Sequence, residues 1–129
     1  FKMFIYTGNF GMYDMMLSYV AVGMIALSFV LYIYFEVKFF YLAYLVDEAL
    51  AQNKAKKYEQ ALALLDKALT IYPYYVTALN NMGNVYTRMK EYQKAKECYD
   101  LVISVDSEYK KAKTNLDLAK KRAGKKMTG

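Results

Sequence analysis

The chain has 129 residues, enough for one small domain, and its formal net charge is +6. Apolar residues make up 57%, above the roughly 45–50% of a soluble domain, so the excess must be buried in lipid or against partners. The sequence holds no histidine and a single cysteine, Cys98, which excludes a His/Cys metal site, an intrachain disulfide and a Ser-His or Cys-His nucleophile pair. We therefore expect no catalytic residue, no cofactor and no metal.

Residues 1–14 form a short aromatic and Met-rich segment. The chain begins at Phe1 rather than Met, so we expect any targeting peptide to have been removed. Two interpretations of the segment stay open. It lies in the membrane interface, or it contacts another membrane subunit.

Residues 15–35 form an unbroken stretch without a charge. As an α-helix this stretch is about 31 Å long, which matches the hydrocarbon thickness of a bilayer. Tyrosine and phenylalanine flank both ends, as in the aromatic belts of membrane spans. A signal peptide would have a shorter apolar region. We predict a transmembrane helix with its interface over residues 15–41.

The charges predict the orientation of this span. Residues 1–41 have no net charge, and all of the +6 lies after them. Several lysines follow the span closely, whereas Lys2 alone precedes it. By the positive-inside rule, we expect the part after residue 41 on the cytosolic side, or on the equivalent stromal or matrix side.

Residues 42–109 contain an internal repeat with a period of 34, divided into units at 42–75 and 76–109. Four positions at helical spacings of three, four and three recur one period later: Tyr58, Ala61, Leu65 and Ala68 pair with Tyr92, Ala95, Tyr99 and Val102. Paired helices repeated at this period are typical of a solenoid array.

The second unit resembles the tetratricopeptide repeat family. Leu79, Met82, Gly83 and Tyr86 stand where the first helix of that family carries its W-x2-L-G-x2-Y pattern. The first unit departs from the pattern at Glu48 and Gln52. Small residues let paired helices approach, and large ones fill the groove between them. The residues expected to pack the repeats are Ala49, Ala61, Gly83, Tyr86, Ala95 and Tyr99.

Residues 110–124 are predicted to form a capping helix, with the apolar stripe Ala112, Leu116 and Ala119 and an end at Gly124. A basic tail, 125–129, follows. The basic residues of this region serve as a solubilising surface or touch anionic lipid or nucleic acid, and we regard nucleic acid as the weaker alternative. The predicted fold is all-α: a transmembrane helix, two tetratricopeptide helix-turn-helix repeats and a cap.

The resemblance implies a partner-binding concave face built by the first helix of each pair. On that face we expect Val46, Leu50, Asn53, Thr77, Asn80, Asn84, Arg88, Lys111, Thr114 and Lys121. Their amides and cations can hydrogen-bond a peptide backbone or a carboxylate. Members of the family that bind chaperone tails hold two carboxylates in a clamp of Lys, Asn and Arg. Val46 and Leu50 occupy two positions of that clamp, so the resemblance does not extend to it. A solvated polar helix face is the alternative.

The order of anchor and repeats is similar to that of the thylakoid photosystem I assembly tetratricopeptide proteins. The resemblance implies a membrane-anchored interaction scaffold, not an enzyme, that works on subunits of a larger membrane complex. An organelle import receptor or a membrane-fission adaptor is the alternative, and the fission adaptors carry their anchor at the other end. A basic protein that binds lipid or nucleic acid is a third possibility, which a steep salt dependence of binding would favour.

Overall fold

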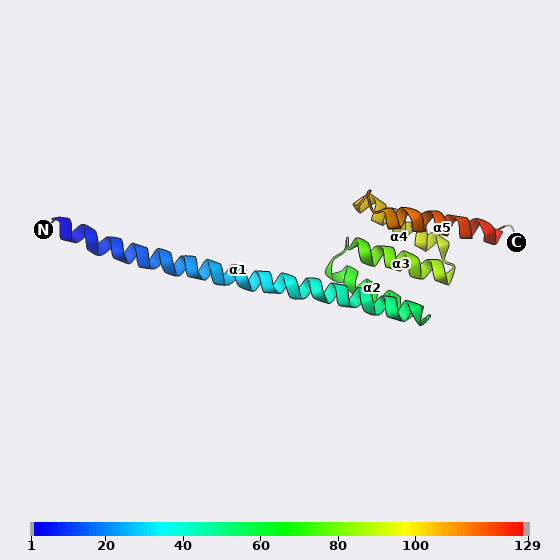
Figure 1. Cartoon of the computed structure of the whole chain (residues 1–129), viewed down its shortest axis with the longest axis horizontal. Helices are drawn as coiled ribbons and strands as arrows, with labels where there is room; N and C mark the ends of the chain where they lie inside the picture. The colour runs from blue at the N-terminus through cyan, green and yellow to red at the C-terminus, as the bar shows by residue number, and fades with distance from the viewer. Residues whose placement is uncertain (1, 128–129) are drawn as a thin grey trace. The chain divides into compact units, whose positions relative to one another are not determined.

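Five α-helices make up the part of the chain that the computed structural model describes, residues 2–127, and no strand occurs in that part. They are α1 (Lys2–Lys54), α2 (Tyr58–Ile71), α3 (Val76–Met89), α4 (Tyr92–Val105) and α5 (Lys110–Met127) (Figure 1). Side chains are described for residues 11–124. The prediction of an all-helical fold is confirmed.

The chain divides into two compact units, residues 1–40 and residues 41–129. The first unit is apolar helix. The described stretch Gly11–Lys54, which begins in this unit, contains an 18-residue apolar window with a mean hydropathy of 2.1 and is long and apolar enough to cross a membrane. The core helix of a soluble protein would be mostly buried, but none of this apolar window is buried within the chain. The side chains of residues 1–10, and with them most of the aromatic segment, lie outside the described residues.

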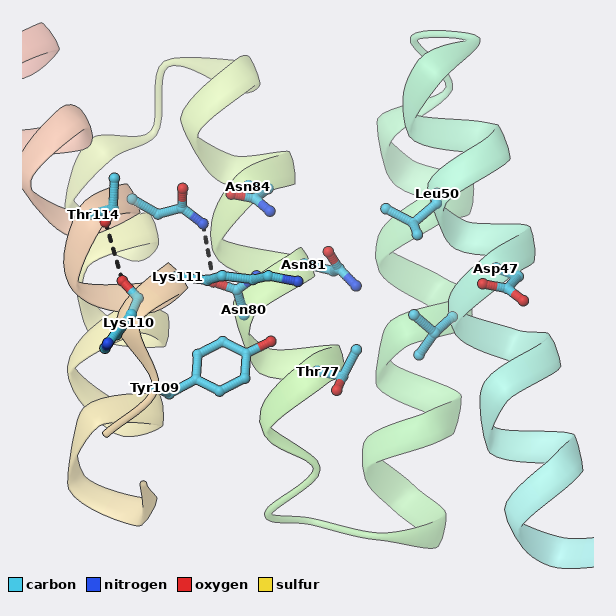
Figure 2. A pocket seen from close by; sticks show the side chains of 12 residues that line it. Asp47, Leu50, Thr77, Asn80, Asn81, Asn84, Tyr109, Lys110, Lys111 and Thr114 are labelled. Atoms are coloured by element: carbon cyan, nitrogen blue, oxygen red, sulfur yellow. Dashed lines mark hydrogen bonds between the residues drawn. The ribbon is translucent and has the colours of Figure 1, made fainter. Parts of the chain in front are cut away.

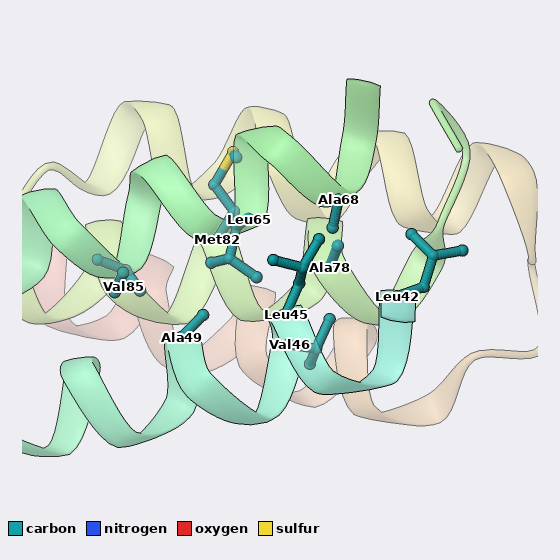
Figure 3. Close-up of a cluster of buried hydrophobic side chains, with 10 residues drawn as sticks. Leu42, Leu45, Val46, Ala49, Leu65, Ala68, Ala78, Met82 and Val85 are labelled. Carbon is teal, nitrogen blue, oxygen red and sulfur yellow. The ribbon is translucent and has the colours of Figure 1, made fainter. Parts of the chain in front are cut away.

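The second unit is a stack of antiparallel helices with two hydrophobic clusters. The last part of α1 pairs with α2, α3 pairs with α4, and α5 packs on α4 and α3. Figure 3 shows the first cluster, formed by α1, α2 and α3, whose buried members are Leu42, Leu45, Val46, Ala49, Ala61, Leu65, Ala68, Ala78, Met82 and Val85. The second cluster joins α3, α4 and α5 through Leu79, Ala95, Tyr99, Val102, Ala112, Leu116 and Ala119.

Each helix pair turns through the same backbone motif. The amide of Lys57 donates to the carbonyl of Gln52 at 2.9 Å, and the amide of Lys56 donates to Asn53 at 3.2 Å. The same two bonds recur one repeat period later, at the end of α3. This is a Schellman motif, in which one residue adopts the left-handed conformation. Lysine occupies that position both times, with φ of 61° at Lys56 and 64° at Lys90.

We expect Lys90→Gly to stabilise the repeats by about 1 kcal/mol, because glycine adopts positive φ without the steric cost that lysine has. The measurement is the urea midpoint of the full chain in detergent, followed by circular dichroism. Lys96→Gly is the control, since it places glycine inside α4 and should destabilise by about 1 kcal/mol. Equal destabilisation by both variants would contradict the left-handed turn.

The single helix α5 buries one stripe and leaves its other faces in water. Ala112, Leu116 and Ala119 are its buried residues, as the sequence predicts. The predicted end at Gly124 is wrong, because α5 continues to Met127. Gly124 does not adopt positive φ, so it serves as a helix residue rather than a left-handed stop. The side chains of the basic tail from residue 125 onward lie outside the described residues.

Candidate binding groove

A hollow of about 570 Å³ lies among the first helices of the pairs (Figure 2). The walls of this hollow come from the last part of α1, from α3, and from α5 with the turn that precedes α5. The lining residues are Val46, Asp47, Leu50, Thr77, Asn80, Asn81, Asn84, Tyr109, Lys110, Lys111, Thr114 and Asn115. The face on which the sequence predicts binding is therefore concave.

A second hollow, of about 330 Å³, adjoins the first. The two share Leu50, Asn84 and Asn115, so they form one continuous depression that we call the groove. The other residues of the second hollow are Asn53, Thr87, Arg88, Tyr99, Leu118 and Arg122.

Hydrogen bonds between side chains fix the floor of the groove. Asn115 Nδ2 donates to Asn80 Oδ1 at 3.0 Å, which ties α5 to α3. The Tyr99 hydroxyl, which is buried, donates to Asn84 Oδ1 at 2.8 Å and lies 3.2 Å from Thr87 Oγ1. Such bonds between helices position the amides before any ligand arrives, which lowers the entropy cost of binding.

The charges that line the groove are mostly positive. Lys110 and Lys111 line the first hollow together with one acid, Asp47. Arg88 and Arg122 line the second hollow, and none of its lining residues is acidic. These cations favour a ligand that carries carboxylates.

Asn53 leaves a buried acceptor in the second hollow. Its side chain is buried, and within the described part of the chain its Oδ1 has no hydrogen-bond partner. The backbone carbonyl of the same residue accepts a bond from Arg88 Nη1 at 3.3 Å. A ligand N–H that reached this oxygen would remove the cost of an unpaired buried group, which is about 1–3 kcal/mol.

The structure distributes the predicted face residues unequally. Those that line the groove and are exposed or half-buried are Leu50, Thr77, Asn84, Arg88, Lys111 and Thr114. Val46, Asn53 and Asn80 line it too but are buried, and Val46 belongs to the first hydrophobic cluster. Lys121 is exposed but does not line the groove. Binding by these residues stays a prediction.

Arg122 takes the place in the groove that the sequence argument assigns to Lys121. One step along an α-helix rotates a side chain by about 100°, so neighbours cannot share a narrow face. Arg122 follows Arg88 by one repeat period, and Asn115 follows Asn81 by the same interval. The repeat period is the signal that identifies both residues.

The predicted packing residues lie between the helices. Ala49, Ala61 and Ala95 are buried in the two clusters, and Tyr86 is half-buried against both. A Cβ on Gly83 would lie 2.5 Å from Tyr99 Cε1 and 2.8 Å from Cζ. Contacts this short do not occur between real atoms, so α3 and α4 approach closely here only because residue 83 is glycine.

Cys98 behaves as a partly buried apolar residue. It packs against the first cluster, and burial raises the pKa of its thiol to about 11, with Glu97 and Asp66 adding to the shift. The thiol is therefore protonated at neutral pH, where the thiolate that would attack a substrate is scarce.

Comparisons with known proteins agree with this fold. Residues 76–113 match the family model of the tetratricopeptide repeat. The tetratricopeptide domain of Sgt2 from Aspergillus fumigatus superimposes with a TM-score of 0.59 and 33% identity, over 60% of this chain and 52% of that one. An uncharacterized protein of Pyropia yezoensis, ycf37, is 38% identical over 56 residues, which are 43% of this chain and 32% of the relative. The matches thus span about half the length of the solved chain and a third of the relative. The predicted tetratricopeptide resemblance is confirmed.

Proposed function

We propose that this chain, which carries tetratricopeptide repeats, is a membrane-anchored scaffold, not an enzyme, that holds a partner protein in its groove. The observation that carries the proposal is the groove itself. It combines hydrogen-bonded amides with exposed cations on α3 and on the single helix α5. Such a surface suits an extended segment, whose backbone bonds to the amides.

The partner segment should be acidic. Four cations against one acid in the groove lining produce a positive potential. Charges at the rim of an interface contribute more to the association rate and to partner choice than to affinity. We therefore expect binding to weaken as salt rises, with each exposed pair contributing about 1 kcal/mol or less.

The partner complex that we propose is photosystem I, during its assembly in the thylakoid membrane. Two observations support this. The apolar helix precedes the repeats, the order in the thylakoid assembly family that the sequence resembles. The similarity to ycf37, at the identity and coverage given above, favours the same assignment. The lysines after the apolar stretch favour repeats on the stromal side.

A pair of charge reversals on one helix tests the groove. Lys111→Glu with Arg122→Glu alters two exposed groove residues of α5. We expect the tagged chain, purified from solubilised thylakoids, to lose about tenfold or more of its photosystem I subunits, which corresponds to roughly 1.4 kcal/mol.

The control is Lys113→Glu with Lys120→Glu, which makes the same change at exposed positions of α5 outside the groove lining. Equal loss in both variants would mean that net charge, not the groove, holds the partner. If a different membrane complex co-purified and was lost only from the groove variant, the scaffold role would stand and the photosystem assignment would fall.

A further inference from the structure

Several tyrosines lie at one end of the repeat unit, the end at which the chain enters it. Tyr41 and Tyr44 are exposed and stack on each other, with ring centroids 6.3 Å apart. The Nζ of Lys67, near the end of α2, lies 5.6 Å from the centroid of the Tyr41 ring. The start of the unit and the last turns of α2 therefore lie together.

The turn between α2 and α3 lies at the same end and carries more tyrosine. Figure 3 shows Leu42 at one end of the first cluster and Val85 at the other. Ile71 and Tyr75, on either side of the turn, pack against that cluster. Within the turn, Tyr72 is 52% exposed and Tyr74 is 60% exposed, so the fold itself leaves these large rings in contact with the surroundings.

The opposite end of the unit has a different chemistry. Lys54, the last residue of α1, is exposed at this end, and the turns between α1 and α2 and between α3 and α4 carry the exposed lysines Lys56, Lys57 and Lys90. Tyr58 and Tyr92, which begin α2 and α4 there, are half-buried. One end of the unit thus presents exposed aromatic rings, and the other presents ammonium groups.

The covalent chain limits how far the tyrosine end can be from a membrane. Tyr41 lies only six positions after Phe35, the last residue of the uncharged stretch, which is about 9 Å of α-helix. Beyond the hydrocarbon core, each headgroup layer is about 5–7 Å thick, so the backbone of Tyr41 lies just past it. A side chain on an α-helix leans back toward the N-terminus of its helix, which brings the Tyr41 ring toward that layer. Tyrosine is enriched in that layer, because its ring is apolar and its hydroxyl group can hydrogen-bond to water or lipid.

We propose that the tyrosine end, defined by Tyr41, Tyr44, Tyr72 and Tyr74, rests in the lipid headgroup layer of the membrane that α1 crosses. The inference rests on the proposed membrane anchor. It goes further by assigning a lipid surface, rather than solvent or protein, as the neighbour of the turn between α2 and α3.

The absence of tryptophan from the sequence allows a direct test. The full chain is reconstituted into phosphatidylcholine vesicles that contain brominated acyl chains, which quench nearby indole fluorescence. Tyr74→Trp is the reporter, and Tyr72→Trp is a second reporter in the same turn. We expect both to be quenched by brominated lipid several-fold more strongly than Tyr92→Trp at the opposite end, and to be less accessible to aqueous iodide.

Phe29→Trp, inside the apolar stretch, separates this inference from the proposed anchor. If brominated lipid does not quench Phe29→Trp, the anchor itself fails. Brominated lipid could instead quench Phe29→Trp strongly but quench Tyr74→Trp and Tyr72→Trp no more than Tyr92→Trp. In that case the anchor stands and the lipid contact of the turn is overturned. Reporters shielded from both iodide and lipid would overturn it as well, in favour of a second protein surface.

Discussion

Gly83→Leu is expected to unfold the repeats while the apolar helix still inserts into membranes. Overpacking typically costs about 1–3 kcal/mol. Here the cost should reach about 3 kcal/mol or more, because the first added carbon already overlaps the Tyr99 ring. That ring cannot easily move aside, since its hydroxyl is bonded to Asn84 at 2.8 Å. The measurements are the urea midpoint of the full chain in detergent and its sedimentation with carbonate-washed membranes.

Gly23→Leu is the matched control for this substitution. Apart from its chain neighbours and the adjacent backbone of its own helix, a Cβ on Gly23, which lies in the apolar stretch, would meet no heavy atom of the described chain within 4 Å. We expect this variant to insert normally and to keep the midpoint of the wild type. An unchanged midpoint for Gly83→Leu would mean that the register placing Gly83 against Tyr99, and with it the groove, is wrong.

Tyr99→Ala should destabilise the repeats by about 3–5 kcal/mol, the usual cost of removing a buried aromatic side chain. The ring is 1% exposed and joins α4 to α3 and α5 in the second cluster. Tyr99→Phe keeps the ring and removes the bond to Asn84, so we expect a smaller loss of about 1 kcal/mol. Urea unfolding of the wild type, Tyr99→Ala and Tyr99→Phe measures the three stabilities. Equal losses of stability in the two variants would contradict the prediction.

A double-mutant cycle isolates the contact between Tyr99 and Gly83. In the wild type, Gly83→Ala should destabilise, because its Cβ overlaps the ring. In the Tyr99→Ala background the ring is gone, and the same change should stabilise by about 1 kcal/mol through helix propensity. A change of sign between the two backgrounds is the expected result. The same sign in both would show that the two residues do not touch.

The helices and their order could be predicted from sequence because two patterns are strong. The uncharged stretch 15–35 is apolar throughout and long enough as a helix to cross a bilayer, so it predicts one long apolar helix. A period of 34 that superimposes Ala61 on Ala95 and Leu65 on Tyr99 fixes which faces are buried, and both pairs are buried in the structure. Apolar residues that recur at helical spacing are the primary sequence signal for a buried helix face.

The groove could be predicted only in outline, because its residues lie at the edge of the buried faces. Val46, Asn53 and Asn80 lie close enough to the core to be buried. The repeat period alone does not tell whether a residue beside the buried face is itself buried or exposed. Lys121 and Arg122 are adjacent in the sequence, and both are basic. Only the position of Arg122 one repeat period after Arg88 indicates that Arg122, rather than Lys121, lines the groove.

The left-handed turns at Lys56 and Lys90 gave no sequence signal, since lysine has no preference for that conformation. These turns follow from the tertiary structure, because the chain must reverse direction after one helix so that the next helix can pack against it. The prediction that the capping helix ends at Gly124 is wrong because a glycine alone does not end a helix. Glycine ends a helix only where the chain needs positive φ, and α5 continues straight on.

The most direct test of the account is the side of the membrane on which the groove lies. Trypsin is added to sealed thylakoid vesicles whose stromal face is outside, and the repeats are detected with an antibody against residues 58–105. We predict that trypsin removes them without rupture of the vesicles, and that the apolar fragment resists carbonate extraction. Repeats that are cleaved only after rupture, or a chain that carbonate releases intact, would contradict a membrane-anchored scaffold that faces the stroma.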